Sequence, residues 1–347
     1  MEGSMWGIWE GDAVDPAGDV LHRADAVSWP LQSLRHHLLA PGDAQGGDGS
    51  EAFWQRLDRV RVGERPHRGR TEQCHHQWAG RRLLALQQVS HPKGLQSPPH
   101  LQSVLFVNNQ NTVVRDIKSV NSKFFHFALL QSKNMKLINI QINAPENSPN
   151  TDGIHIERST GVVISDTRIS TGDDCISIGQ GSDNIDIARV HCGPGHGMSV
   201  GSLGRYVGEG DVTRVHVRDM TFVGTMNGVR IKTWENSPTK SLAAHMLFEN
   251  MVMKDVQNPI IIDQKYCPYY DCEHKHVSGV TLKDITFKNI KGTSSMPVAV
   301  LLRCGVPCQG VVLQDVDLKY MGEGGSSSKC ENAMATYVGY QHPEPCA

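Results

Sequence analysis

The feature that most constrains this chain is a short segment, rich in β-branched and apolar residues, that recurs from residue 104 onward. Consecutive copies start about 23 to 34 residues apart, and several open on Asn or Gly. A steady period of this length, with turn residues at the start of each copy, is typical of a β-solenoid. The segments begin at Asn111, Asn134, Gly161, Asn184, Val212, Ala244, Val277 and Cys308.

Each segment alternates apolar and polar residues, as in Val-Thr-Leu-Lys-Asp-Ile-Thr-Phe from Val280. On a β-strand this alternation sends one set of side chains inward and the other outward. One coil cannot bury its inward set alone, so successive coils must stack, with paired strands about 4.8 Å apart. A β-sandwich is the alternative, but its strands recur every ~8–12 residues and are joined by hairpins. The period therefore predicts an all-β solenoid over residues 104–347.

The charge balance argues against two classes of partner. The 347 residues include 34 Lys and Arg and 36 Asp and Glu, which gives a formal net charge of −2. This field is too weak to indicate nucleic-acid or membrane binding, so local cations must hold any anionic ligand. No window approaches the ~18 apolar residues of a membrane span. Met1 to Asp12 lack a basic and an apolar region, so we expect no signal peptide in the chain as written.

Eight of the nine cysteines lie after residue 170, in close pairs. Such clustering predicts disulfides and an oxidising compartment. Buried free thiols are the alternative, and zinc is disfavoured because no histidine lies at ligand spacing among the pairs. The expected disulfides are Cys175–Cys192, Cys267–Cys272, Cys304–Cys308 and Cys330–Cys346, which leaves Cys74 over.

Residues 1–103 do not share this pattern. They are rich in Arg, His, Gln, Trp, Pro and Gly, and they sustain neither alternation nor a helical period. A shifted reading frame is one physical cause. With one base dropped, the codons of Cys74 to Gly80 permit Val-Thr-Ile-Ser-Gly-Arg-Gly, which alternates as a strand does. We therefore predict that 1–103 is an anomalous segment, out of frame or poorly ordered, and that 104–347 is the β-helical domain.

Four motifs with charged residues follow the same period. They are N-T-D-G at 150–153, G-D-D-C at 172–175, G-H-G at 195–197 and R-I-K at 230–232. Residues one period apart in a solenoid stack on one face, so Asp152, the Asp173–Asp174 pair and His196 should line up across three adjacent coils. Arg230 and Lys232 are two residues apart and should point the same way.

This row of side chains suits hydrolysis of an acidic polymer. Crowded carboxylates cannot all ionise easily, so at least one pKa should rise while others stay low. Glycosidic hydrolysis needs one protonated acid and one ionised base. Two cations on one strand face suit a polymer with a carboxylate on every sugar, and the flanking glycines should leave it room. Taken singly, each motif also fits a solvated turn or a surface charge, so the prediction rests on their order and spacing.

In that order and spacing, the motifs resemble those of the polygalacturonases, glycoside hydrolase family 28, over residues 104–347. The stretches around Arg230 and Tyr266 are most similar to the exo-acting enzymes of plant pollen. The resemblance implies a right-handed parallel β-helix that hydrolyses α-1,4-galacturonosyl bonds of polygalacturonate, or pectin, with inversion. It further implies that no metal or cofactor is needed, and that the enzyme is secreted to the cell wall and monomeric.

The resemblance also implies roles by position. Asp173 would be the general acid, Asp152 and Asp174 would activate the attacking water, and His196 would keep the acid protonated and in place. The sequence leaves open which of Asp173 and Asp174 is the acid. The substrate-binding residues would be Arg230 and Lys232 for galacturonate carboxylates, Asn150 for a further contact and Tyr266 for packing against a sugar.

Two other functions remain open at this point. One is another pectin-active enzyme on the same fold, such as a rhamnogalacturonan hydrolase or a pectate lyase. A lyase typically needs calcium and a basic proton abstractor, which the aspartates and the Arg-Lys pair disfavour. The other is a truncated, inactive homologue that at most binds pectin, which the unusual residues 1–103 favour.

Overall fold

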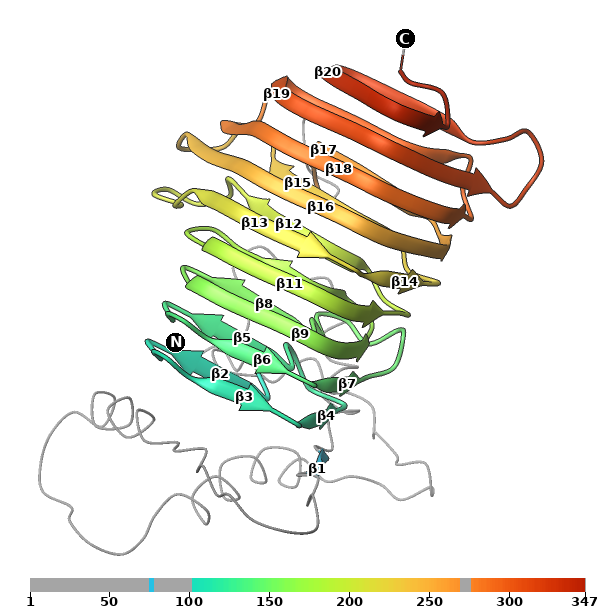
Figure 1. Ribbon diagram of the computed structural model, residues 1–347. Helices are drawn as coiled ribbons and strands as arrows, with labels where there is room; N and C mark the ends of the chain where they lie inside the picture. The colour runs from blue at the N-terminus through green and yellow to red at the C-terminus, as the bar shows by residue number, and fades with distance from the viewer. Residues whose placement is uncertain (1–74, 78–101, 269–275, 347) are drawn as a thin grey trace, which may run out of the picture. The chain divides into compact units, whose positions relative to one another are not determined.

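The computed structural model describes residues 75–77, 102–268 and 276–346. All the regular secondary structure in these ranges is β-strand, and the pairings between strands are parallel. The coils form a right-handed parallel β-helix, which confirms the predicted fold class. Figure 1 shows its strands advancing along the stack in sequence order from β2 to β20.

The strands form three stacks that run along the solenoid. The first, here the site sheet, contains β2 (Val104–Val107), β5 (Phe127–Leu130), β8 (Ile154–Glu157), β10 (Asp174–Ile178), β12 (Gly197–Leu203), β15 (Asn227–Trp234), β17 (Asn258–Tyr266) and the first parts of β19 (Val298–Tyr320) and β20 (Ser327–His342). The second, here the back sheet, contains β3 (Val113–Arg115), β6 (Lys136–Ile138), β9 (Thr160–Ser170), β11 (Asp183–Cys192), β13 (Val212–Arg218), β16 (Ser241–Val256), β18 (Val280–Ser294) and the later parts of β19 and β20. The third contains β1 (His75–Gln77), β4 (Lys118–Val120), β7 (Gln141–Asn143), β14 (Thr221–Val223) and the ends of the long strands β9, β11, β16, β18, β19 and β20.

The Asn and Gly residues that open the repeats lie where the chain turns a corner. Asn134 and Asn184 have φ angles of 52° and 56°, and Gly161 has 69° at the equivalent place. This left-handed backbone is accessible to Gly and tolerated by Asn. The Asn134 Nδ2 also donates to the Asn111 Oδ1 of the preceding coil, at 3.0 Å. The Asn and Gly residues that recur with the sequence period are therefore the corner residues of the coils.

The core lies inside the coils and is built from apolar ladders in register. Ile154, Ile176 and Met198 pair across β8, β10 and β12, and none of the three is exposed. Phe248 and Phe287 stack with ring centroids 5.3 Å apart. Alternate side chains on the same strands face outward, so the core fixes which residues the site sheet presents.

Three predicted disulfides are confirmed, namely Cys175–Cys192, Cys304–Cys308 and Cys330–Cys346. The fourth involves Cys272, which lies outside the described residues, as does Cys74. Of the anomalous segment 1–103, the structure describes only 75–77 and 102–103, and β1 pairs with β4. The proposed boundary near 103 therefore stays a prediction. The described residues contain no helix that is long and apolar enough to span a membrane.

Candidate active site

The predicted row of acids lies on three neighbouring coils of the site sheet. Ile154 of β8 pairs with Ile176 of β10. Asp152 and Asp174 each lie two residues before these isoleucines, so they occupy equivalent positions on neighbouring coils. Asp174 in turn pairs with Gly197, and the His196 amide donates to the Asp173 carbonyl at 2.8 Å. The expected alignment across adjacent coils is confirmed.

Asp174 is the buried, cation-bound member of the row, with only 1% of the residue exposed. Its Oδ1 accepts hydrogen bonds from Ser199 Oγ at 2.8 Å and Arg230 Nη2 at 3.1 Å, and its Oδ2 accepts one from Lys232 Nζ at 2.8 Å. Burial by itself raises the pKa of Asp174, but the charges of Lys232 and Arg230 outweigh it and hold the pKa well below the usual range. Arg230 and Lys232 point the same way, as predicted.

Asp152 has the opposite electrostatics. It is 6% exposed, and its Oδ2 accepts a hydrogen bond from Ser177 Oγ at 2.6 Å. Burial raises the pKa of Asp152 well above its ordinary value, and the charges of Asp173 and Asp174 raise it further. The pKa values in the row are therefore split, as the crowding of carboxylates predicted.

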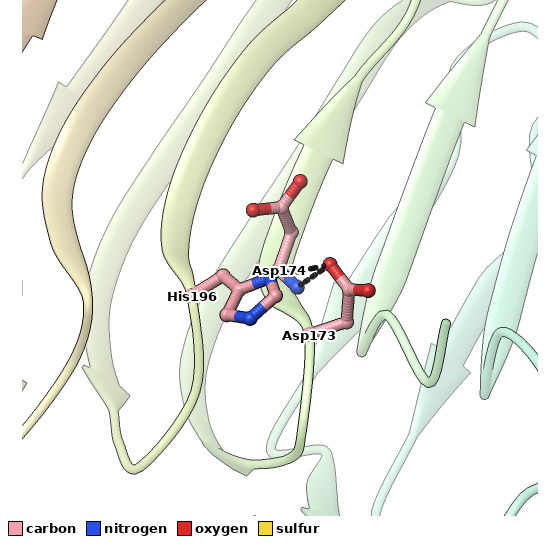
Figure 2. Close-up of side chains that lie close together, drawn as sticks. All are labelled: Asp173, Asp174 and His196. Carbon is pink, nitrogen blue, oxygen red and sulfur yellow. Dashed lines mark hydrogen bonds and ion pairs between the residues drawn. The ribbon is translucent and has the colours of Figure 1, made fainter. Parts of the chain in front are cut away.

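Asp173 is the most accessible of the three aspartates, with 20% of its side chain exposed. Its Oδ1 accepts a hydrogen bond from the Asp174 amide at 2.8 Å and lies 3.0 Å from His196 Nδ1. Within the described part of the chain, no Lys or Arg forms an ion pair with it. Figure 2 shows the Asp173 and Asp174 carboxylates pointing in different directions, with the His196 ring beside Asp173.

The two remaining predicted residues border this row. Asn150 has a φ of 52°, and its backbone amide donates to Asp173 Oδ2 at 3.1 Å. The Tyr266 ring centroid lies 5.4 Å from Lys232 Nζ and 5.9 Å from Arg230 Cζ, and burial raises the pKa of Tyr266. All eight residues selected from the sequence thus belong to one constellation.

The expectation that the flanking glycines leave room for a polymer is wrong. A Cβ on Gly153 would meet the carbonyl oxygen of Cys175, and one on Gly197 would meet that of Asn227. Neighbouring coils of the protein itself therefore occupy the space. At Gly197 a φ of 87° adds a second reason for glycine.

Sequence reasoning missed the two serines that hold the buried aspartates. Ser177 follows Asp174 by three residues, and Ser199 follows His196 by three. Each is a hydroxyl between two apolar residues of a strand, in Ile-Ser-Ile of β10 and Met-Ser-Val of β12. The two serines occupy the same position on adjacent coils, and this repetition is the sequence signal that could have identified them.

Asp173, Asp174 and His196 also bring three potential metal ligands within 4.8 Å of one another. Both oxygens of Asp174, however, already accept hydrogen bonds from cationic side chains. The positive charges of Arg230 and Lys232 oppose a further cation here and favour an organic anion. The arrangement therefore suits acid–base chemistry on a carboxylated substrate.

Comparisons with known proteins agree with this geometry. The model of the glycosyl hydrolases family 28 matches residues 86–339. The chain is 48% identical over 237 residues to an exopolygalacturonase of Platanus acerifolia, covering 67% of this chain and 63% of that protein. It is 50% identical over 240 residues to an exopolygalacturonase of Oenothera organensis, covering 68% and 66%. The chain therefore spans less than two thirds of the length of either relative.

Solved structures give the same fold. The polygalacturonase of Erwinia carotovora aligns with a TM-score of 0.57 at 28% identity, covering 68% of this chain and 60% of that one. The endo-xylogalacturonan hydrolase of Aspergillus tubingensis aligns with a TM-score of 0.63 at 21% identity, covering 75% and 73%. At that identity the second match supports the fold alone.

Proposed function

The chain belongs to the glycosyl hydrolases family 28, and from this premise we propose that it hydrolyses the α-1,4-galacturonosyl bonds of polygalacturonate by inverting acid–base catalysis. The observation that carries the proposal is the split among the three aspartates. One is buried and bound by two cations, one is buried with a raised pKa, and one is accessible and beside a histidine. Such a split assigns acid and base to different groups.

Asp173 is the proposed general acid. The Lys232 and Arg230 contacts keep Asp174 ionised, so Asp174 cannot supply a proton. Asp173 has no such cation in the described residues, and it presents part of its carboxyl group to solvent. His196 Nδ1, 3.0 Å from Asp173 Oδ1, orients the carboxyl group for proton transfer to the glycosidic oxygen.

Asp152 and Asp174 are the proposed activators of water. The raised pKa of Asp152 makes its ionised form the stronger base, and Asp174 supplies a fixed negative charge beside it. Inversion follows because water attacks directly while the acid protonates the leaving group, with no covalent sugar intermediate.

The substrate carboxylates are held by the same cations that hold Asp174. Arg230 uses Nε for Ser199 and Nη2 for Asp174, which leaves further N–H groups for a galacturonate. Tyr266 lies beside both cations, and its ring is the proposed packing surface for a sugar. We further propose exo-action on pectin, which the names of the exopolygalacturonase relatives support. Secretion to the plant cell wall is proposed as well, since disulfides form in oxidising compartments. A monomer is proposed without a supporting observation.

The test is reducing-end release from de-esterified polygalacturonate by the purified chain. We expect monogalacturonate to accumulate from the first minutes, as exo-action requires. Mixed oligomers would mean endo-action, and an ultraviolet-absorbing unsaturated product would mean a lyase. Binding of polygalacturonate without any sugar release would overturn the proposal and favour the inactive homologue.

A further inference from the structure

A chain of hydrogen-bonding groups leads from Asp152 toward the surface of the site sheet. Ser177 Oγ lies 2.6 Å from Asp152 Oδ2 and 2.8 Å from His155 Nδ1. On the other side of the ring, His155 Nε2 lies 3.5 Å from Glu157 Oε2. We call Ser177, His155 and Glu157 the relay. None of the three belongs to the four motifs that identified the site.

The fold holds the relay in place. Ser177 and His155 pair in register between β10 and β8, so their outward side chains lie side by side. The ring of Phe125 packs against that of His155, with centroids 4.7 Å apart. Gln180 Nε2 donates to Glu157 Oε1 at 2.8 Å and fixes the far end.

Exposure increases along the relay. Ser177 is 2% exposed, whereas the side chains of His155 and Glu157 are 19% and 31% exposed. A proton held by Asp152 can therefore reach water through these groups, although Asp152 itself is buried. The other charged groups near Asp152 are Asp173, Asp174 and Lys232, and Arg158 lies 3.7 Å from Glu157.

The proposed reaction creates a need for such a route. Each hydrolysis takes a proton from water onto the base and delivers one from Asp173 to the leaving group. Before the next turnover, Asp152 must lose its proton again. We propose that Ser177 and His155 return Asp152 to its ionised form by passing that proton toward Glu157 and solvent. This inference rests on the proposed function, and it makes His155 a positioning residue that acts through Ser177.

The transfer balances within the relay. Protonated Asp152 donates to Ser177 Oγ while the Ser177 hydroxyl proton moves to Nδ1 of the neutral His155 ring. The ring is then an imidazolium beside the Glu157 carboxylate, and it releases its Nε2 proton to solvent. In the reset state, His155 Nδ1–H donates to Ser177, and Ser177 donates to ionised Asp152, an arrangement that the two short contacts allow. Before the next transfer the ring must again present an unprotonated nitrogen to Ser177, and a half-turn of the ring about its Cβ–Cγ bond restores that state.

The test compares His155→Asn and Ser177→Ala in the full chain. The Asn amide can still hydrogen-bond Ser177, but it cannot take up a proton. We expect kcat on polygalacturonate to fall about tenfold in both variants, with KM little changed. A His155→Ala variant should regain kcat when free imidazole is added. His216→Asn, whose ring forms ion pairs on the back sheet, is the matched control and should keep wild-type kcat.

Three outcomes would overturn the relay. The first is a wild-type kcat in His155→Asn. The second is a change in KM alone in His155→Asn and Ser177→Ala. The third is a loss of kcat in His155→Ala that imidazole does not restore. If the wild-type chain itself releases no sugar, the proposed function fails instead. The relay is then judged by NMR titration of the Asp152 carboxyl group, whose pKa must rise in Ser177→Ala because the Ser177 hydrogen bond lowers it. An unchanged titration would reject it.

Discussion

Among the described residues, a row of charged side chains on the back sheet can be compared with the row on the site sheet, and the two differ in their electrostatics. On the back sheet, Arg218 Nη1 lies 2.8 Å from Asp186 Oδ2, and His216 Nε2 lies 2.9 Å from Glu249 Oε1. Lys288 Nζ extends this back-sheet ladder to Glu249 at 3.4 Å. The row on the site sheet contains the same kinds of groups at similar distances.

Burial separates the two rows. In the back-sheet ladder the side chains are 17% to 42% exposed, and the hydrogen bond from His216 simply lowers the pKa of Glu249. In the site row, the Asp174 side chain is 2% exposed and needs two cations to stay ionised, while the pKa of Asp152 rises. Ion pairs alone therefore do not mark the site. Desolvation does, because it forces neighbouring acids to titrate differently.

The largest expected contrast between the rows is in catalysis. Asp173→Asn should lower kcat by about 10²–10⁴-fold, because the amide cannot donate a proton to the leaving group. Asp186→Asn on the back sheet should keep wild-type kcat. Initial rates of reducing-end release measure both. Wild-type activity in Asp173→Asn would break the comparison and remove Asp173 from the mechanism.

The second contrast concerns the cations. Lys232→Met should destabilise the fold at neutral pH by about 3 kcal/mol, because it leaves the buried Asp174 short of a partner. Lys288→Met, in the exposed ladder, should cost less than about 1 kcal/mol. Denaturant unfolding measures both. The pKa of Asp174 is lower in the folded state than in the unfolded state. The stability that wild type gains over Lys232→Met is therefore present above the unfolded pKa of Asp174 and is lost as the pH falls through its folded pKa.

Lys232→Met should also change the pH profile of any residual activity. Lys232 lowers the pKa values of both Asp152 and Asp174, so its loss raises them. The base must be ionised to work, and the acid limb of the profile should therefore move to higher pH. An unmoved limb would mean that neither aspartate is the base.

The smallest expected effect is a gain in stability when Asp152 loses its charge. The native pKa of Asp152 is raised, so its ionised form costs stability as pH rises from the unfolded pKa near 3.8 through the native value. Asp152→Asn should therefore be inactive yet more stable than wild type at pH 7. The gain should vanish below pH ~4. Thermal unfolding across pH is the measurement, and a variant less stable at every pH would contradict the burial argument.

Much of the fold was predictable because a solenoid repeats its signals. The corner residues Asn134 and Asn184 recur with the period, and that period placed Asp152, Asp174 and His196 on adjacent coils. The shared direction of Arg230 and Lys232 followed from their separation of two residues on a strand.

The contacts between coils were not predictable in the same way. That Arg230 and Lys232 bind Asp174, and that backbone fills the space beside Gly153, depend on side-chain length and on how closely the coils approach. Nor could spacing separate Asp173 from Asp174, since the two adjacent acids differ in the direction of their side chains and in burial. The roles of Ser177 and His155 appear only when β8 and β10 are in register.

The most direct test of the account is the anomeric form of the first product, followed by NMR immediately after wild-type enzyme is mixed with polygalacturonate. In the proposed mechanism Asp152 and Asp174 activate water and neither attacks the sugar, and both oxygens of Asp174 are held by donors. The new reducing end should therefore form first as the β-anomer, opposite to the α-linkage that is cleaved. An initial α-anomer would show retention and would contradict the assignment of Asp152 and Asp174 to water activation.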